Sequence, residues 1–465
     1  MSDNNGSIKV PVELLRKYDR PGPRYTSYPT APVWSDKVIS ENYAAALKTA
    51  SKQTDQPLAA YVHIPFCRRR CYYCGCNTYI TKSSDRVKKY IDALITEIKL
   101  TAELLGGRKK ISQLHFGGGT PTYVEIDDFN RILGALEENF EFIPGCEKSL
   151  EIDPRVTTFE QLDYLAGRGF NRISVGVQDV DPTVQEAIGR IQSFELVSEV
   201  VEYCRQLKFK GINIDLIYGL PKQTIERFDG SLLKAVQLKP DRVALYSFAY
   251  LPDAKANQKK ISPDDLPATE IKYRLFADAV KIFTGHGYRQ IGMDHFALPE
   301  DELSIAQEDG RLYRNFMGYT VQSSPDMIGL GMSSIGYINH SFFQNHSSLD
   351  AYMNVIGEER LATYRGMILS YDDLIRQNVI MSLMCNFRLD FNDLKEKFGI
   401  DYHTYFTDEH QKLAEFFTDD FLEMHNGGIK VTPVGRTFIR NIAMTYDNYL
   451  GGRLPGKKPT FSRTI

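Results

Sequence analysis

Short apolar runs alternate with longer amphipathic segments over residues 58–248. Six runs have the length and the β-branched or aromatic content of buried strands: 58–64, 111–116, 148–152, 172–177, 211–219 and 242–248. Five segments between them have the length and period of helices: 85–105, 125–139, 158–168, 194–208 and 224–237. Strands and helices that alternate in this way form βαβ units, so we predict an α/β fold with a curved or barrel-like parallel sheet.

The chain on either side of this alternation has a different character. The N-terminal region contains the proline-rich stretch DRPGPRYTSYPTAPVW, which disfavours helix and central strand. The alternation loosens after about residue 255. Gly- and Met-rich stretches follow, which we interpret as extensions of the central domain around its functional site. Near residue 370, short helices followed by a small hairpin are typical of a winged-helix arrangement. We predict an N-terminal arm that closes over the site, a central domain with extensions and a mainly helical C-terminal domain: residues 1–57, 58–368 and 369–465.

Unusual residues follow the predicted strands. They are the cysteine loop CRRRCYYCGC (67–76), GGGTPT (117–122), EIDPR (151–155), Gln178, Asp215 within the fifth strand, and SFAY (247–250). In parallel sheets, ligands bind at the carboxyl ends of the strands. We therefore predict a single site at this edge, although a triple glycine alone is also compatible with a simple turn and Asp215 alone with a buried structural acid.

Composition excludes several classes of protein. The chain has 465 residues, of which 42% are hydrophobic, enough for a large core. The formal net charge is −3, without the basic surface that nucleic-acid binding requires. No apolar run is long enough to span a membrane, and the N-terminus MSDNNGSIKV lacks the apolar stretch of a secretory signal. We expect a cytoplasmic, monomeric protein that binds neither nucleic acid nor membranes.

Four of the seven cysteines lie within residues 67–76. Such a cluster in a reducing compartment indicates metal or redox chemistry. Cys67, Cys71 and Cys74 have the spacing C-x3-C-x2-C, which lets one loop hold an iron–sulfur cluster, whereas structural zinc sites usually need a second cysteine pair. Three ligands would leave one iron of a 4Fe–4S cluster open to a small molecule. Spacing alone does not decide whether Cys76 is a fourth ligand, a residue of the site or a bystander.

The cysteine pattern, with Tyr73 beside its last member and a glycine-rich segment after the second strand, resembles the radical S-adenosylmethionine (radical SAM) enzymes. The resemblance is closest to the oxygen-independent coproporphyrinogen III oxidases and runs from about residue 17 to the terminal FSRTI. It is carried by the blocks PRYTSYPT, YVHIPFC, CGCN, GGGTPTY, EIDPR, NIDLIYGLPKQT, GMDHFA and CNFRLD. It implies a partial (β/α)6 barrel and the O2-independent oxidative decarboxylation of two propionates of coproporphyrinogen III to vinyl groups, giving protoporphyrinogen IX for haem synthesis.

The resemblance also assigns residues. Cys67, Cys71 and Cys74 would ligate the 4Fe–4S cluster. The expected contacts with a first S-adenosylmethionine are Tyr61, Gly118, Glu151 and Ile335, and those with a second are Tyr73, Gly119, Thr120, Gln178, Arg190, Asp215 and Ala249. The candidate catalytic residues are Cys76 (as a non-ligand), Tyr61 and His63. For His63, a proton relay and a satisfied buried histidine remain alternatives.

Further residues are candidates for substrate and partner binding. The arm supplies Arg20 and Arg24 for the propionates and Tyr25 and Tyr28 for the flat macrocycle; a disordered tail is the alternative. Arg68–Arg70, next to the cluster ligands, are expected to dock a flavodoxin-like or other small electron donor, unless they are only a solvated surface run.

One departure and two competing functions qualify this assignment. Bacterial relatives are expected to have a glutamine at Met317, so contacts from that segment are in doubt. Relatives within the same superfamily act as haem chaperones, which bind and deliver haem without decarboxylation, and others are methyltransferases that use two S-adenosylmethionine molecules. The fourth cysteine in CGCN and the arm PRYTSYPT favour the oxidase.

Overall fold

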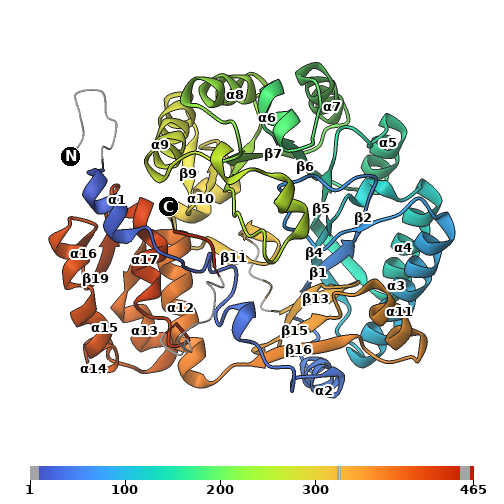
Figure 1. Cartoon of the computed structure of the whole chain (residues 1–465). Coiled ribbons are helices and arrows are strands. Elements are labelled where there is room, and N and C mark those ends of the chain that lie inside the picture. The colour runs from blue at the N-terminus through green and yellow to red at the C-terminus, as the bar shows by residue number, and fades with distance from the viewer. Residues whose placement is uncertain (1–9, 322–323, 325, 451–460, 465) are drawn as a thin grey trace.

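The computed structural model describes residues 10–321, 324, 326–450 and 461–464. A large α/β barrel-like domain lies beside a smaller, mainly helical domain, and the N-terminal segment runs between them (Figure 1). Within the described residues, no helix is both long and apolar enough to cross a bilayer.

The six predicted strands form the parallel centre of one twelve-stranded sheet, so the predicted α/β fold is confirmed. In sheet order they are β1 (Leu58–Ile64), β4 (Lys110–Gly118), β5 (Glu141–Ile152), β6 (Arg172–Gln178), β7 (Gly211–Tyr218) and β8 (Arg242–Ser247).

The sequence did not indicate the strands at the two edges of this sheet. β13 (Asp326–Leu330) adds a seventh parallel strand beside β1. Antiparallel strands follow it, and two more lie beside β8: β14 (Ile335–Ile338), β15 (Ser341–Asn345), β16 (Thr363–Ile368), β10 (His295–Ala297) and β9 (Arg289–Ile291). They are short, and the glycines around β13 and β14 hide their pattern. Gly329, for example, lies so close to Ile335 that an added Cβ would come within 2.6 Å of its backbone.

The helices cover the outside of the barrel and bury their apolar faces against it (Figure 1). All five predicted helices are present: α3 (Ser84–Leu104), α4 (Ile126–Asn139), α5 (Phe159–Gly167), α7 (Phe194–Gln206) and α8 (Ile225–Gln237). The others around the sheet are α6 (Pro182–Ala187), α9 (Thr269–Gly285), α10 (Glu302–Glu308) and α11 (Leu349–Gly357). Side-chain caps fix where several begin; Ser193, for example, accepts a hydrogen bond from Leu196 N–H at the start of α7.

The period-two alternation of the strands separates an apolar outer face from a polar interior. Leu114, Phe116 and Leu150 point to the helical side and are fully buried. Tyr61 is in register with His115, and Glu151 with Ser174, on the inward positions. The interior of the barrel is therefore lined by functional groups, with the strand ends opening toward the cysteine loop.

The N-terminal segment contains helices that its prolines did not suggest. α1 (Val12–Tyr18) buries Leu15 and Tyr18 in the core of the C-terminal domain, whereas α2 (Ser40–Ala50) packs against the barrel. A short 3-10 helix, η1 (Ala31–Val33), lies between them. Apolar residues at helical spacing on both sides of the proline-rich stretch stabilise these helices through tertiary packing.

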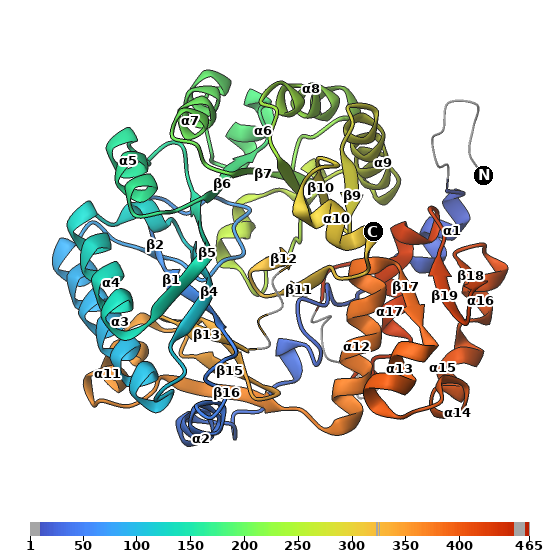
Figure 2. The ribbon, with the colours of Figure 1, turned by 180° about the vertical axis from the view of Figure 1, so that it is seen from behind.

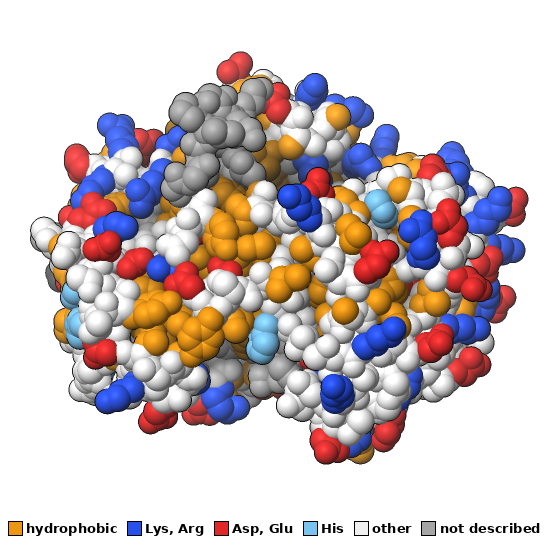
Figure 3. Space-filling view, turned by 90° about the horizontal axis from the view of Figure 1, so that it is seen from below, with side chains coloured by type: hydrophobic (Ala, Val, Ile, Leu, Met, Phe, Trp, Pro, Cys, Tyr) orange, Lys and Arg blue, Asp and Glu red, His pale blue; other side chains and the backbone are white. Residues whose placement is uncertain are grey.

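The C-terminal domain has its own hydrophobic core. Its elements are α12 (Tyr371–Asn386), β17 (Arg388–Asp390), α13 (Phe391–Phe398), α14 (Tyr402–Tyr405), α15 (Thr407–Lys412), α16 (Ala414–Thr418), β18 (Leu422–His425), β19 (Gly428–Val431), η5 (Gly435–Phe438) and α17 (Ile439–Met444). Short helices followed by the β18–β19 hairpin, with β17 as a third strand, give the winged-helix-like order that was predicted. On the face seen in Figure 3, acidic and basic side chains are interspersed around apolar patches.

Candidate active site

The cysteine loop is held in place by the backbone and by two amide side chains. β2 (Phe66–Cys67) pairs with β3 (Tyr79–Ile80) and closes the loop at its base. The side chain of Asn257, in η3 (Ala256–Lys260), donates to the carbonyl oxygens of Cys71, Tyr72 and Cys74 at 3.2, 2.9 and 3.0 Å. Gln258 donates to Tyr73 at 3.0 Å. The loop is therefore preorganised by a segment about 185 residues further along the chain.

Four cysteine thiols of this loop face one cavity of about 560 Å³. Arg155 and Arg190 approach Cys71 Sγ at 3.7 and 3.8 Å. A hydrogen bond from Cys76 holds the pKa of the Cys74 thiol below its usual value, whereas burial raises that of Cys67 to about 11. Nearby guanidinium groups favour thiolates, the form in which cysteine binds metal. Cys76 is exposed to the cavity beside Cys74.

The glycines at the end of β4 are required by close packing. Gly118 has a φ of +117°, and a Cβ there would come within 2.6 Å of the His63 ring. A Cβ at Gly119 would come within 2.6 Å of the Pro65 carbonyl oxygen. The segment therefore does more than turn the chain, because only glycine lets β4 approach the start of the cysteine loop this closely.

Glu151 lies beneath these glycines in a layer of polar groups. Its Oε2 accepts a hydrogen bond from Gly118 N–H at 3.3 Å, and its Oε1 lies 3.6 Å from His115 Nε2. His115 stacks on the Tyr61 ring, with a centroid separation of 5.9 Å. The carboxylate is thus positioned from two strands, and part of it faces the cavity.

The half-buried Tyr61 and the buried His63 form a pair next to the cavity. Tyr61 Oη and His63 Nδ1 are 3.0 Å apart, and His63 Nε2 is 3.0 Å from the carbonyl oxygen of Asn77. Burial lowers the pKa of His63, so its neutral form is favoured. Both ring nitrogens have protein partners, which supports the satisfied buried histidine rather than a relay open to the cavity.

A second group of polar residues lies at the ends of β5, β6 and β7. Arg190 Nη1 donates to Asp153 at 2.9 Å and Nη2 to the carbonyl oxygen of Gly176 at 2.6 Å, whereas its buried Nε has no hydrogen-bond partner in the described part of the chain. Gln178 adopts a positive φ of 68°, an uncommon conformation for this residue that is often found at functional sites.

Asp215 on β7 is held in place by neighbouring side chains. It accepts hydrogen bonds from Ser174 at 3.0 Å and Asn213 at 2.8 Å. Burial, and then the negative charge of Glu151, raise the pKa of Asp215 to about 7. A carboxyl whose pKa is shifted this far in a cavity is a typical ligand-binding group.

The cavity brings together most of the residues predicted from the sequence. It is lined by Cys67, Cys71, Cys74, Cys76, Tyr73, Gly118, Gly119, Thr120, Glu151, Gln178, Arg190, Asp215 and Ala249. Tyr61, His63 and Ile335 are not in its lining. Ile335 begins β14 and packs against Gly329, the residue in register with Tyr61, so it lies two strands away from Tyr61 within the sheet.

Several residues of the cavity were missed. Asp153 and Arg155 stand within the EIDPR segment, at or just after the end of a predicted strand, and this position was the available signal. His115, which lies next to Glu151 but outside the lining of this cavity, could have been found from its inward register with Tyr61. Lys255 and Gln258 carried no local signal, because they reach the site only through the tertiary fold.

Of the arm residues predicted to contact the substrate, Arg24 lies in the cavity, where its role stays a prediction, and the prediction for two tyrosines is wrong. Arg24 lines the cavity, and its guanidinium donates to the carbonyl oxygen of Ser247. Tyr25 and Tyr28 are 1% and 0% exposed, in the core of the C-terminal domain, so they cannot lie against a macrocycle. Their rings are large apolar surfaces that this small domain uses to complete its core. Arg20, the other predicted arginine, is not in the cavity lining.

A second, smaller cavity of about 130 Å³ lies inside the barrel and shares Glu151, Asp215 and Tyr246 with the first. The hairpin of β11 (Tyr313–Asn315) and β12 (Gly318–Thr320) lies at the centre of the barrel (Figure 2) and brings Met317 into its lining. Met317, at the position where bacterial relatives are expected to have a glutamine, therefore faces the interior of the site.

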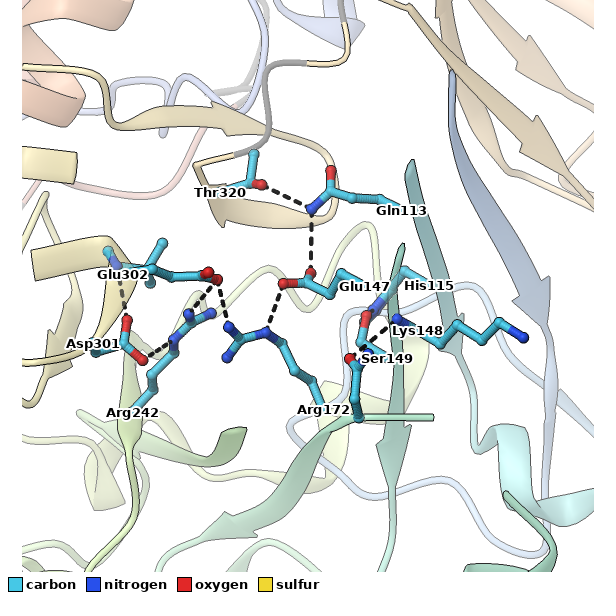
Figure 4. A network of polar contacts seen from close by, with 12 residues as sticks. Gln113, His115, Glu147, Lys148, Ser149, Arg172, Arg242, Asp301, Glu302 and Thr320 are labelled. Atoms are coloured by element: carbon cyan, nitrogen blue, oxygen red, sulfur yellow. Dashed lines mark hydrogen bonds and ion pairs between the residues drawn. The ribbon is translucent and has the colours of Figure 1, made fainter. Parts of the chain in front are cut away.

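An ion-pair network fills the amino-terminal end of the barrel (Figure 4). Arg172 pairs with Glu147 at 2.6 Å and also with Glu302, while Arg242 contacts Asp301 at 2.9 Å and Glu302 at 3.0 Å. Gln113 links Glu147 to Thr320 of the hairpin. The network joins β4, β5, β6 and β8 to the segment around α10.

The residues at the carboxyl-terminal end fit a metal cluster with a charged organic cofactor. Three thiols at cluster-binding spacing face an open cavity, and the unpartnered Nε of Arg190 is an orphaned donor in the same wall. Carboxylates on the opposite strands can accept hydrogen bonds from an ammonium group or ribose hydroxyls.

Comparison with known proteins agrees with this geometry. Residues 61–235 match the radical SAM superfamily, and residues 369–438 match the HemN C-terminal domain. Oxygen-independent coproporphyrinogen III oxidases from Salmonella typhimurium and Escherichia coli are 43% and 42% identical to the chain over 454 residues, 98% of both sequences in each case. The solved structure of the Escherichia coli coproporphyrinogen III oxidase HemN, described as a radical SAM enzyme, superposes with a TM-score of 0.90, 41% identity and coverage of 96% of this chain and 100% of that one. The chain belongs to the oxygen-independent coproporphyrinogen III oxidase family of radical SAM enzymes.

Proposed function

We propose that the protein converts two propionates of coproporphyrinogen III to vinyl groups without O2 and forms protoporphyrinogen IX in haem biosynthesis. The observation that carries the proposal is the single cavity in which three cluster-spaced thiols, Cys76 and Arg24 face one another. Its volume of about 560 Å³ is in the range of small-molecule sites. The relatives of matching length bear the name of this activity.

As a radical SAM enzyme, the protein uses a 4Fe–4S cluster and S-adenosylmethionine. Cys67, Cys71 and Cys74 would hold the cluster. Together these groups supply one-electron chemistry that removes a hydrogen atom from the β-carbon of a propionate, after which CO2 and one electron leave. The protein contributes orientation and the exclusion of water.

The chain's own residues divide this work among the strand ends. Glu151, held by Gly118 N–H, is suited to hydroxyl or ammonium groups of a first S-adenosylmethionine. The Nε–H of Arg190, without a partner among the residues that the structure describes, is available for a carboxylate, and Asp215 and Gln178 lie on the same wall, which supports a second molecule there. Cys76, beside Cys74 but exposed, is placed to meet substrate rather than to complete the cluster.

Two further proposals concern partners. Arg69 and Arg70 line the rim next to the cluster thiols, and Arg68 is exposed nearby, so an acidic one-electron donor such as a flavodoxin could dock there. We still expect the protein to be monomeric and cytoplasmic and to bind neither nucleic acid nor membranes, in keeping with its mild net charge.

Anaerobic incubation tests the proposed activity. Protein reconstituted with iron and sulfide is mixed with coproporphyrinogen III, S-adenosylmethionine, a reductant and an electron acceptor. We expect vinyl product and 5′-deoxyadenosine in proportion. Stable haem binding without any decarboxylation would instead identify a haem chaperone, and methylated product would identify a methyltransferase.

A further inference from the structure

Two guanidinium groups converge on the sulfur atom of Cys71, the middle thiol of the cluster-spaced set. Arg155 Nη2 donates to Cys71 Sγ at 3.7 Å, and Arg190 Nη1 donates to the same atom at 3.8 Å. Arg155 follows the end of β5, whereas Arg190 follows α6, so two separate segments of the barrel reach one sulfur atom. Both donors are charged, which makes such hydrogen bonds stronger than those from neutral groups.

Asp153 holds both arginines in this position. It accepts hydrogen bonds from Arg155 Nε at 2.9 Å and Arg155 Nη2 at 2.6 Å, and from Arg190 Nη1 at 2.9 Å. Arg190 Nη2 is fixed in addition by the carbonyl oxygen of Gly176 at 2.6 Å. The two nitrogen atoms that approach the sulfur of Cys71 are therefore the same two that Asp153 Oδ2 orients. We call these three residues the Arg155–Asp153–Arg190 triad.

The other two cluster-spaced thiols have different partners. Cys67 Sγ lies 3.5 Å from the hydroxyl group of Thr120, and Cys74 receives a hydrogen bond from Cys76. Within the part of the chain that the structure describes, a guanidinium group donates to a cysteine sulfur only at Cys71. Cys71 is thus distinguished from the other two by its charged donors.

The triad brings positive charge to this sulfur. Its two guanidinium groups and one carboxylate leave one net positive charge. Glu151 and Asp215, the other carboxylates among the described residues of the cavity lining, form no hydrogen bond with the triad in that part of the chain. The positive charge next to Cys71 is therefore only partly neutralised, and it lies in a buried wall where electrostatic interactions are less screened than in water.

Charge and hydrogen bonds at the sulfur atoms are two of the factors that set the reduction potential of an iron–sulfur cluster. Reduction adds one electron from an external one-electron donor, so the cluster with its thiolates becomes more negative by one charge. Positively charged donors at a ligand sulfur stabilise this reduced state more than the oxidised state, because their interaction energy grows with the negative charge.

We propose that the Arg155–Asp153–Arg190 triad raises the reduction potential of the 4Fe–4S cluster through Cys71 and so allows a weaker donor to reduce it. This inference rests on the proposed function, since it needs Cys71 as a cluster ligand. Asp153 acts as a positioning residue that keeps both guanidinium groups on the sulfur. Arg155 provides the cleaner test, because Arg190 also offers its Nε to a ligand.

The test measures the midpoint potential of the full-length reconstituted protein by anaerobic spectroelectrochemistry without S-adenosylmethionine. In Arg155→Gln, the equilibrium constant for reduction should fall roughly tenfold, which lowers the midpoint potential by about 59 mV for a one-electron couple. Arg190→Gln should shift the potential in the same direction, and the double variant should have the lowest potential. Arg155→Lys keeps the positive charge and should restore part of the potential.

Arg168→Gln is the matched control. Arg168 follows α5 on the outside of the barrel and pairs with Glu137 at 2.6 Å, so its replacement removes one positive charge without touching the cysteine loop. The midpoint potential of this variant should equal that of the wild type. A shift as large as that of Arg155→Gln would show that net charge, rather than the contact with Cys71, sets the potential, and would overturn the proposal.

Iron content is measured first in every variant, so that loss of the cluster is not confused with a shift in its potential. If Arg155→Gln loses iron, Arg155→Lys and Arg190→Gln decide the proposal. Wild-type potentials in both glutamine variants would overturn the role of the triad and leave the proposed activity intact. Wild-type protein that has a measurable potential but forms no vinyl product would instead overturn the proposed activity, and the potentials of the variants would still decide the role of the triad.

Discussion

Inward-facing side chains line both ends of the barrel. Their charged groups are paired at the amino-terminal end but only partly paired at the carboxyl-terminal end. At the amino-terminal end, Arg172 and Arg242 share Glu302 and each pairs with a further carboxylate. At the carboxyl-terminal end, Arg190 keeps a buried donor that has no partner in the described part of the chain, and Asp215 has a pKa raised to about 7.

This difference separates stability from function. A network whose charges are all paired joins strands and gains nothing from a ligand, whereas unsatisfied groups are costly until a ligand completes them. Residues that are unfavourable for the unliganded fold therefore mark the site. Substitutions at the two ends should consequently have different effects, and the following experiments test this.

The largest effect is expected from the cluster thiols. Cys71→Ser should abolish both iron binding and turnover, because it removes one of the three proposed ligands of the 4Fe–4S cluster. Cys76→Ser should keep the iron and its visible absorbance but lose turnover, because Cys76 faces the cavity and we propose that it is not a cluster ligand. Iron analysis and anaerobic vinyl formation measure both. Loss of iron from Cys76→Ser would make it a fourth ligand and would remove the open coordination position on which the proposed function depends.

The next effect compares matched arginines at the two ends. Arg190→Met removes a donor that we expect to bind a carboxylate, so the Kd for S-adenosylmethionine should rise roughly thirtyfold. Isothermal titration of the reconstituted protein measures this value. Because Asp153 retains Arg155 at 2.6 Å, the fold should tolerate the change. Unchanged affinity would show that Arg190 serves only to position Asp153.

At the opposite end, Arg242→Met should leave the affinity for S-adenosylmethionine within about twofold. It should destabilise the protein by about 3 kcal/mol, because Asp301, whose side chain is only 8% exposed, loses its ion-pair partner. Denaturant unfolding measures this loss. Arg289→Met is the control, since its pair with Glu308 is exposed and should contribute less than about 1 kcal/mol. Equal stability of both variants would show that the network at this end does not hold the barrel together.

The part of this arrangement that the sequence predicts is the part carried by local patterns. Period-two and helical repeats gave the six strands and five helices, and strand-end position gave Glu151 and Asp215. Long-range partners had no such signal: Asn257 holds the cysteine loop from about 185 residues away. Tyr25 and Tyr28 were misassigned because residue type alone does not distinguish an aromatic ring for a ligand from one that fills a core.

The smallest effect concerns the protonation of Asp215 in the unliganded protein. The pKa of an aspartate carboxyl is 3.8 in an unfolded chain, whereas that of Asp215 is about 7 in the folded protein. Between about pH 4 and pH 7 the folded state therefore binds more protons, so this group makes stability fall as pH rises through that window. Asp215→Asn, which resembles the protonated carboxyl, should remove this decline.

Other groups titrate with the same sign, so only the difference between the two proteins is informative. Glu97, for example, has a pKa raised to about 7 by burial on the outer side of the barrel. The free energy of unfolding of Asp215→Asn minus that of wild type should increase between pH 5 and pH 8 by a few kcal/mol at most. Parallel curves would mean that Asp215 is ionised in the folded protein, with its charge balanced as completely as those of the arginine network at the other end. The distinction between a satisfied end and an unsatisfied end would then depend on Arg190 alone.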